Sequence, residues 1–260
     1  LSDNALVNIM DEKNATPMAG KVVVCETNNP NPFKAMHIGH AFNAILAETV
    51  ANLVEAGGAV THRVSYPGDV GLHVGKSMYS LLKFVDGDAS RLETVPPVER
   101  NTFMSRMYSE GSKAYNDDSE AKTAIDELAK QSFTPGDPLY KSVYETCKAW
   151  SFEQIDELVL RLGNKPVEKR YLESEADSLG VETVKKHIGE VFVESDGALV
   201  FPGSKYGSFD NVFVSSAGRG LYGARDLGLM QLKHRDFSAN KSYIVTAEEQ
   251  RDYFKGVIKA

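Results

Sequence analysis

The stretch ETNNPNPFKAMHIGH, residues 26–40, decides the fold of this chain. An apolar run leads into it and an amphipathic segment leaves it, while Asn and Pro crowd its middle, so it predicts a strand, an irregular loop and a helix start. If the helix begins near Ile38, the imidazoles of His37 and His40 lie on one face of its first turn. That turn has free backbone N–H groups and the positive end of the helix dipole, which suit phosphate.

Other residues of the stretch add polar groups to the same place. Gly39 lets a flat ring approach the backbone. Glu26 and Asn31 direct polar groups toward the same predicted site. Together these groups predict a nucleotide site with a second, polar ligand beside it. The two histidines could also bind a metal, but zinc needs a third ligand, and His62 and His73 are not in an obvious register. We therefore expect no dedicated protein-bound metal.

The composition is that of a soluble globular chain. Its 260 residues, 42% hydrophobic and 25% charged, suffice for one large domain or a core with an inserted subdomain. Because the chain begins with Leu, we expect that its N-terminus has been trimmed. We expect neither a targeting segment nor a membrane span. Two cysteines, Cys25 and Cys147, make no disulfide framework and favour a reduced, cytoplasmic setting. The net charge of −7 argues against a general nucleic-acid surface, so RNA would need a local basic patch.

Residues 21–76 alternate between strand and helix patterns. Val22–Cys25 is a buried strand by its apolar run, and residues 60–66 predict a second strand. Between them, apolar residues recur at helical spacing and Gly57 ends the helix; the spacing comes from Ala41, Ile45, Leu46, Val50, Leu53 and Val54. Such a unit implies a right-handed crossover and a parallel sheet, with ligands outside the carboxyl ends of its strands.

The segment after the second strand is rich in glycine. Its Gly75-Lys76-Ser77 ending suggests a phosphate-binding P-loop, but position 70 is Val where that pattern requires Gly, so we reject it. Asp69 is a plausible N-cap for the next helix. Residues 77–165 predict a helical insertion, with helices near 97–118, 118–131 and 138–162 whose charges are solvated.

Residues 166–260 return to a mixed pattern. A strand at 167–172 precedes Glu173 and Glu175, and two short hairpin-like strands near 196–201 and 211–214 lead back into the main sheet. A helix from about residue 223 places Tyr222 and Asp226 four residues apart, although Asp226 could merely stabilise that helix. A last strand at 243–245 precedes Gln250 and another helix start.

The polar segments that follow the predicted strands resemble, in their order along the chain, the motifs of class I aminoacyl-tRNA synthetases. The tetrapeptide at 37–40 is the first signature of that class, and the lead-in of Glu26, Asn31 and Lys34 resembles its arginyl version. Asp69-Val70-Gly71 stands where Asp-Trp-Gly is frequent, which leaves a role for Asp69 open. The resemblance covers roughly residues 20–76 and 165–260.

The resemblance implies an α/β fold, a Rossmann-like doubly wound parallel sheet with a helical insertion between its two halves. Its divisions are a lead-in or the end of an upstream domain at 1–20, a first half at 21–76, a connective insertion at 77–165 and a second half at 166–260. ATP would bind at His37, Gly39 and His40, with Lys34 joining the histidines in catalysis. Arginine would bind at Glu26, Asn31, Glu173, Tyr222, Asp226 and Gln250, with Glu175 as the alternative to Glu173.

These residue types suit arginine. A guanidinium is planar, always charged and has five donors, so a selective site needs carboxylates such as Asp226 and Glu173, and the Tyr222 ring can pack on it. Asn31, Gln250 and Glu26 can fix the amino-acid end. Binding and preorganised charge would supply most of the catalysis, and Mg²⁺ would accompany ATP without a protein cage.

We therefore expect ATP-dependent activation of L-arginine to arginyl-adenylate and its transfer to tRNA(Arg), by a cytoplasmic monomer. The sequence has no second signature resembling Lys-Met-Ser-Lys and no anticodon-reading domain, so we expect a catalytic-domain fragment that is incomplete as an enzyme. Two alternatives stay open, another HxGH-type nucleotidyltransferase and a non-catalytic, synthetase-derived amino-acid-binding module. Selective guanidinium binding would separate the first of these from an arginyl enzyme.

Overall fold

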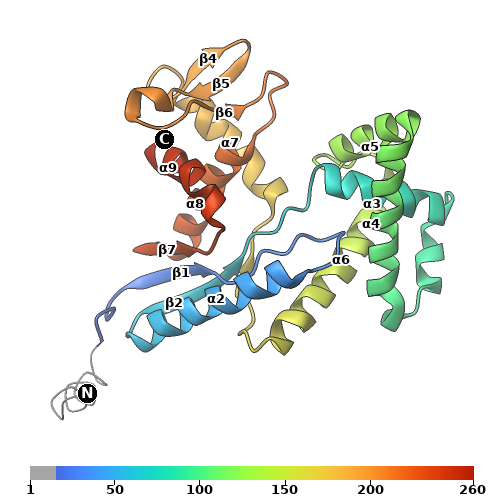
Figure 1. The fold of residues 1–260 in the computed structure, drawn as a ribbon, viewed down its shortest axis with the longest axis horizontal. Helices are drawn as coiled ribbons and strands as arrows, with labels where there is room; N and C mark the ends of the chain where they lie inside the picture. Colours follow the sequence, from blue (N-terminus) through green and yellow to red (C-terminus); the bar gives the residue numbers. More distant parts are fainter. Residues whose placement is uncertain (1–15) are drawn as a thin grey trace.

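A four-stranded parallel sheet forms the centre of the molecule. The computed structural model describes residues 16–260, so the predicted lead-in at 1–20 lies mostly outside the described residues. The sheet has the order β3-β2-β1-β7 and every pairing is parallel; its strands are β1 (Val22–Glu26), β2 (Val60–Ser65), β3 (Lys169–Arg170) and β7 (Lys241–Ile244). Helix α2 (Ile38–Ala56) joins β1 to β2 (Figure 1). The Rossmann-like prediction is confirmed.

Helices cover both faces of this sheet, because alternate side chains of β1 point to opposite faces. Val23 and Cys25 pack with Ala51 of α2 on one face. On the other, Val24 packs with buried residues of α7 (Glu173–Lys186) and α8 (Tyr222–Phe237). Cys25 is 1% exposed, so it is a core residue.

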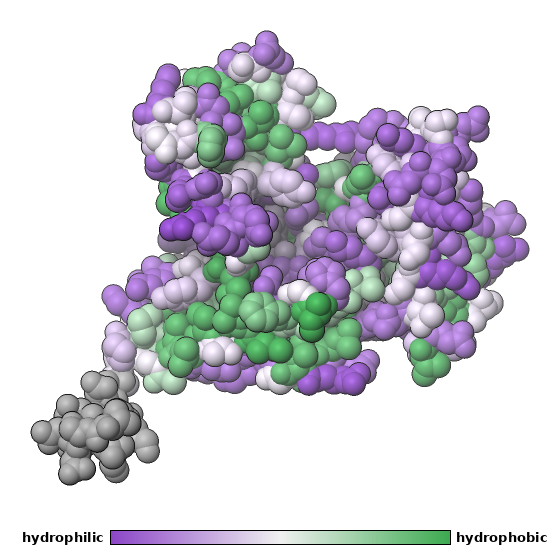
Figure 2. Space-filling model, viewed as in Figure 1, coloured by the Kyte–Doolittle hydropathy of each residue, from purple (hydrophilic) through white to green (hydrophobic). Residues whose placement is uncertain are grey.

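Helix α2 exposes most of the larger apolar residues that revealed it in the sequence. Its buried face consists of small residues and one acid: Ala44, Ala47, Glu48 and Ala51. Glu48 accepts a 2.9 Å hydrogen bond from Nε of Arg63 in β2, and this buried pair fixes which face turns inward. Leu53 is 68% exposed and Phe42 64%. Figure 2 shows the resulting hydrophobic band where α2 lies in Figure 1.

The segment between β2 and β3 forms a helical unit with its own core. It contains four helices, α3 (Leu72–Val85), α4 (Arg100–Asp117), α5 (Ser119–Gln131) and α6 (Pro138–Arg161), and two short 3₁₀ turns, η2 (Ala89–Thr94) and η3 (Pro97–Glu99). Three of the helices were predicted within a few residues. Helix α3 runs across positions 76 and 77, where the sequence predicts the division between first half and insertion; that division stays a prediction.

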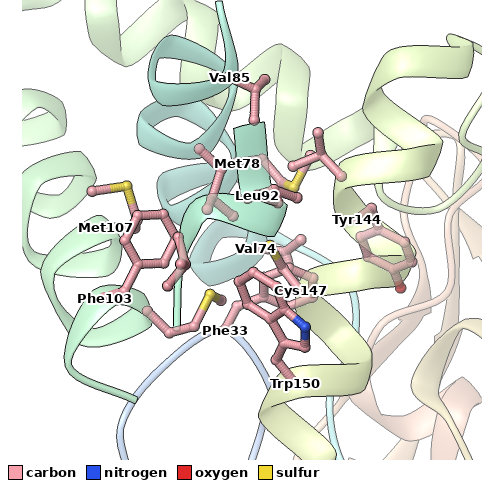
Figure 3. Close-up of a cluster of buried hydrophobic side chains, with 14 of the residues drawn as sticks. Phe33, Val74, Met78, Val85, Leu92, Phe103, Met107, Tyr144, Cys147 and Trp150 are labelled. Carbon is pink, nitrogen blue, oxygen red and sulfur yellow. The ribbon is translucent and has the colours of Figure 1, made fainter. Parts of the chain in front are cut away.

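Phe33 ties the loop after β1 to this helical unit. Its side chain is fully buried in the core that Figure 3 shows, where it stacks on Tyr144 with ring centroids 5.3 Å apart. Its backbone N–H donates to Oγ of Ser151 at 3.1 Å, and its carbonyl accepts from Oγ of Ser77 at 2.7 Å. The loop that leads to α2 is therefore anchored in the insertion.

The chain after α7 forms a second, antiparallel sheet with the order β4-β5-β6, from β4 (Val193–Ser195), β5 (Ala198–Phe201) and β6 (Asn211–Val214). The short strands predicted near 196–201 and 211–214 exist, but they pack on α8 and α9 (Arg251–Lys259) and do not join the main sheet. The 3₁₀ turns η4 (Gly203–Tyr206) and η5 (Glu248–Gln250) complete this part. Among residues 16–260 we find no helix with the length and hydropathy that crossing a bilayer requires.

Candidate functional site

A cleft of about 640 Å³ lies at the carboxyl ends of the parallel strands. It brings together residues that follow β1, β2, β3 and β7, as the parallel topology dictates. Five of the six residues expected to bind arginine line it, namely Glu26, Glu173, Tyr222, Asp226 and Gln250. Asn29, Tyr66 and Tyr253 line it as well.

Glu26 forms a buried ion pair that the sequence did not reveal. It is 4% exposed, as is Lys233 of α8, whose Nζ donates to Glu26 Oε1 and, at 3.2 Å, to Oγ of Ser242. Lys233 looks like an ordinary surface lysine in the sequence, and only the packing of α8 on β1 turns it inward.

Asn29, not Asn31, contacts the Glu26 carboxylate. Asn29 Nδ2 donates to Glu26 Oε2 at 2.7 Å, and its Oδ1 accepts from the backbone N–H of Tyr66 at 2.7 Å. Asn31 is outside the cleft lining, and its Oδ1 accepts from the N–H of Gly68 at 2.8 Å. With three asparagines in four positions, the sequence carries no signal that would choose between them.

Glu173 already has a guanidinium partner within the protein. Arg225 of α8 donates from Nη1 to Glu173 Oε2 at 3.0 Å and from Nε to Oδ1 of Asp177 at 3.0 Å. Burial raises the pKa of Glu173, and the charge of Arg225 acts against that rise. Glu175 is exposed and does not line the cleft, so of the two alternatives only Glu173 faces it.

Two of the lining carboxylates, Asp226 and Glu249, have no salt-bridge partner among residues 16–260, and of these Asp226 is the one partly removed from solvent. It accepts a hydrogen bond from the hydroxyl of Tyr253, and within residues 16–260 it forms no ion pair. Burial, with a smaller contribution from the Glu26 charge, raises its pKa to about 6 against the opposing effects of the Tyr253 hydrogen bond and of Lys233 and Arg225. A cationic ligand would stabilise its ionised form, and the 70% exposed ring of Tyr222 stands at the same cleft.

The two histidines cap helix α2 in a reciprocal arrangement. Nδ1 of His37 accepts from the N–H of Gly39 at 3.1 Å, and Nδ1 of His40 accepts from the N–H of His37 at 3.2 Å. Their ring centroids are 3.9 Å apart, in agreement with the predicted shared face. A Cβ on Gly39 would stand 3.0 Å from the His37 ring, so this glycine makes room for the cap itself.

His40 is neutral at ordinary pH. Burial, together with the smaller effects of the His37 and Lys34 charges, lowers its pKa to about 4. Since Nδ1 accepts, Nε2 carries the proton and can donate to an anion. His37, His40 and Lys34 do not line the 640 Å³ cleft, whereas Asn43 of the same helix does.

Asp69 holds the start of α7, not that of α3 as the capping prediction had it. It is 1% exposed and accepts from the backbone N–H of Ser174 at 3.0 Å, from Oγ of Ser174 at 2.8 Å and from the hydroxyl of Tyr144 at 2.9 Å. Helix α3 begins after Gly71, whose φ of +101° turns the chain away. Asp69 thus joins the insertion to the helix that carries Glu173.

In the described part of the chain, no three His, Cys, Asp or Glu side chains are grouped as a metal site. Nδ1 of His62 lies 2.7 Å from Oε2 of Glu168, and Nε2 of His73 lies 2.8 Å from the Gly68 carbonyl.

Comparison with known proteins agrees with this architecture. The arginine–tRNA ligase of Treponema denticola is 26% identical over 98% of this chain and 44% of its own length, and that of Bdellovibrio bacteriovorus is 29% identical over 90% and 40%. The chain thus spans well under half of these relatives.

Solved structures share the fold. Plasmodium falciparum arginyl-tRNA synthetase superimposes with a TM-score of 0.71 at 21% identity, over 97% of this chain and 41% of its own. The Thermus thermophilus arginyl-tRNA synthetase gives 0.63 at 20% identity, over 91% and 40%. The family model described as tRNA synthetases class I (R), catalytic domain, matches residues 3–260. Because the match covers nearly the whole sequence, the chain belongs to the family of class I (R) tRNA synthetase catalytic domains.

Proposed function

We propose that this chain carries the catalytic core that activates L-arginine with ATP to arginyl-adenylate and transfers it to tRNA(Arg). The observation that carries the proposal is Asp226, a partly buried carboxylate with no ion pair in the described residues, at the wall of the cleft of about 640 Å³. A guanidinium would neutralise it with paired hydrogen bonds, and the Tyr222 ring stands ready to pack on the cation.

The other end of the cleft suits the amino-acid group. Glu26 offers a fixed carboxylate to the α-ammonium, and Gln250, with Asn31 in the loop behind, completes the predicted set. The ligand carboxylate then attacks the α-phosphorus of ATP, a mixed anhydride forms, and pyrophosphate leaves. A ribose hydroxyl of tRNA next attacks the activated carbonyl and releases AMP.

The start of α2 would meet the phosphates. His40 donates from Nε2 as a neutral ring, His37 and Lys34 stand beside it, and Gly39 leaves the turn open. These groups act on charge that develops on the phosphates, with no covalent enzyme intermediate. Mg²⁺ arrives with ATP, and a cytoplasmic monomer stays our expectation.

Calorimetric titration tests this proposal. The chain is titrated with L-arginine, L-lysine and L-citrulline, with and without a non-hydrolysable ATP analogue, alongside Asp226→Asn and the control Asp252→Asn, an exposed acid on α9. Of the three amino acids, we expect only L-arginine to bind. Of the two variants, only Asp226→Asn should abolish that binding. Equal binding of all three ligands would overturn the guanidinium assignment and favour another HxGH nucleotidyltransferase or a binding module.

A further inference from the structure

The buried ammonium of Lys233 has no role in the function proposed above. Its side chain is 5% exposed and that of Glu26 is 2% exposed, so their ion pair is almost fully removed from solvent. Lys233 lies behind Glu26 and is not among the residues that line the cleft, whereas Glu26 is. It therefore touches Glu26 and no ligand.

Both oxygens of Glu26 are fixed. Lys233 holds Oε1 from α8, and Asn29 holds Oε2 at 2.7 Å. Lys233 is itself restrained by Oγ of Ser242 in β7 at 3.2 Å, and Asn29 by the backbone N–H of Tyr66. Groups from α8, β7 and the loops after β1 and β2 thus determine one orientation of one carboxylate at the cleft wall.

The charge of Lys233 matters as much as its position. Removal of one partner from a buried ion pair leaves an uncompensated buried charge, which is costly. Glu26 bonds to Lys233, and its charge acts on Asp226 of α8 and on the phenol of Tyr66. Arg225 bonds to Glu173 and Asp177, so Lys233 is the cation that bonds Glu26.

The pair is not explained by stability alone. Well-packed apolar residues in place of a buried ion pair frequently stabilise a protein as well or better. We propose that Lys233 is a positioning residue for ligand binding, which pairs with Glu26 and holds its carboxylate oriented to receive the ammonium group of the amino acid. This inference rests on the proposed function, and it names the group that makes Glu26 competent.

The test compares Lys233→Met with Lys169→Met, which removes a lysine–carboxylate pair with Asp236 far from the cleft lining. L-Arginine affinity is measured by calorimetry at about pH 6.5 and about pH 8.5. We expect Lys233→Met to bind about tenfold more weakly at about pH 8.5, where Asp226, with a pKa of about 6, is ionised with or without this lysine, so that the loss there reports the orientation of Glu26. Lys169→Met should match the unsubstituted chain at both pH values.

A double-substitution cycle covers the case in which Lys233→Met alone does not fold. Glu26→Gln and Glu26→Gln/Lys233→Met leave no unpaired buried acid at position 26, and both should bind equally weakly at about pH 8.5, where Asp226 is ionised and Lys233 acts on binding through Glu26. A further loss in the double variant at that pH, or an unchanged affinity of folded Lys233→Met there, would overturn the inference. Failure of the unsubstituted chain to bind L-arginine would instead sink the proposed function.

Discussion

Arg225 and Glu173 form an ion pair across α8 and α7, with Nη1 3.0 Å from Oε2, at the wall of the cleft. The same guanidinium bonds Asp177 and lies 5.2 Å from the ring centroid of Phe133. Glu173 therefore meets a ligand with its charge already compensated, and Asp226 is left to select the incoming cation.

Removal of that guanidinium should destabilise the chain strongly. Arg225→Met leaves two partly buried carboxylates unpaired, and we expect a loss of about 3 kcal/mol or more in the free energy of unfolding. Arg235→Met, on the same helix but 62% exposed in its side chain, should change it by less than about 1 kcal/mol. Urea unfolding measures both, and equal losses would contradict a structural role for the Arg225 pair.

Ionisation of Asp226 should make the free energy of unfolding and the affinity for L-arginine change in opposite directions with pH. Its pKa rises from 3.8 to about 6 on folding, so the native state binds more protons than the unfolded state between these values. Stability therefore falls as pH rises through this window, by up to about 3 kcal/mol for a two-unit shift. L-Arginine affinity should rise over the same window, because the guanidinium pairs with the ionised form. Asp226→Asn should remove the contribution of Asp226 to the stability slope, which urea unfolding measures between about pH 4.5 and about pH 7, while calorimetry on the unsubstituted chain measures the affinity slope over the same range.

Helices α7 and α8 pack so closely that an added methyl group does not fit. A Cβ at Gly180 would stand 1.9 Å from the carbonyl oxygen of Ala224. We expect Gly180→Ala to lower the free energy of unfolding by about 3 kcal/mol and to shift Asp226 relative to Glu173. Gly136→Ala, where a Cβ meets nothing within 4 Å, should be neutral or slightly stabilising. Thermal unfolding of both compares them, and an undisturbed Gly180→Ala would show that the helices can separate freely.

Asp69→Asn should loosen the start of α7. The carboxylate satisfies the N–H and Oγ of Ser174 and the Tyr144 hydroxyl, and the amide replaces one acceptor oxygen with a donor. A loss of about 2 kcal/mol or more is expected, against about 1 kcal/mol for Asp118→Ala, an exposed N-cap of α5. Denaturant unfolding ranks the two, and the reverse order would refute the junction that we describe.

His40 should titrate far below an ordinary histidine. Burial, His37 and Lys34 lower its pKa to about 4, so its ring resonances should stay constant from neutral pH down to about pH 5. Lys34→Met removes one positive charge and should raise that pKa. Two-dimensional NMR of the imidazoles measures both, and a midpoint near the usual value of about 6.5 would rule out the buried, neutral ring.

The sequence predicted the helices and strands and their order better than it predicted which side chains form hydrogen bonds and ion pairs with one another. Strand β1 and helix α2 were evident from the apolar run and from the histidines at the helix start. The buried face of α2 was not, because the Glu48–Arg63 pair and three alanines turn inward while larger residues such as Leu53 face outward. The sequence did not predict that Lys233 and Asn29 bond to Glu26. These residues lie 207 and three positions from Glu26 in the chain, and such separations produce no periodic pattern.

The burial of Phe33 in the core of the insertion couples the helical unit to the loop that precedes α2. The hydroxyl groups of Ser77 and Ser151 form hydrogen bonds with the backbone of Phe33, and the loop ends four residues later at the His37 cap. Because only four residues separate Phe33 from the His37 cap, the packing of Phe33 in the insertion helps to set where the two imidazoles lie.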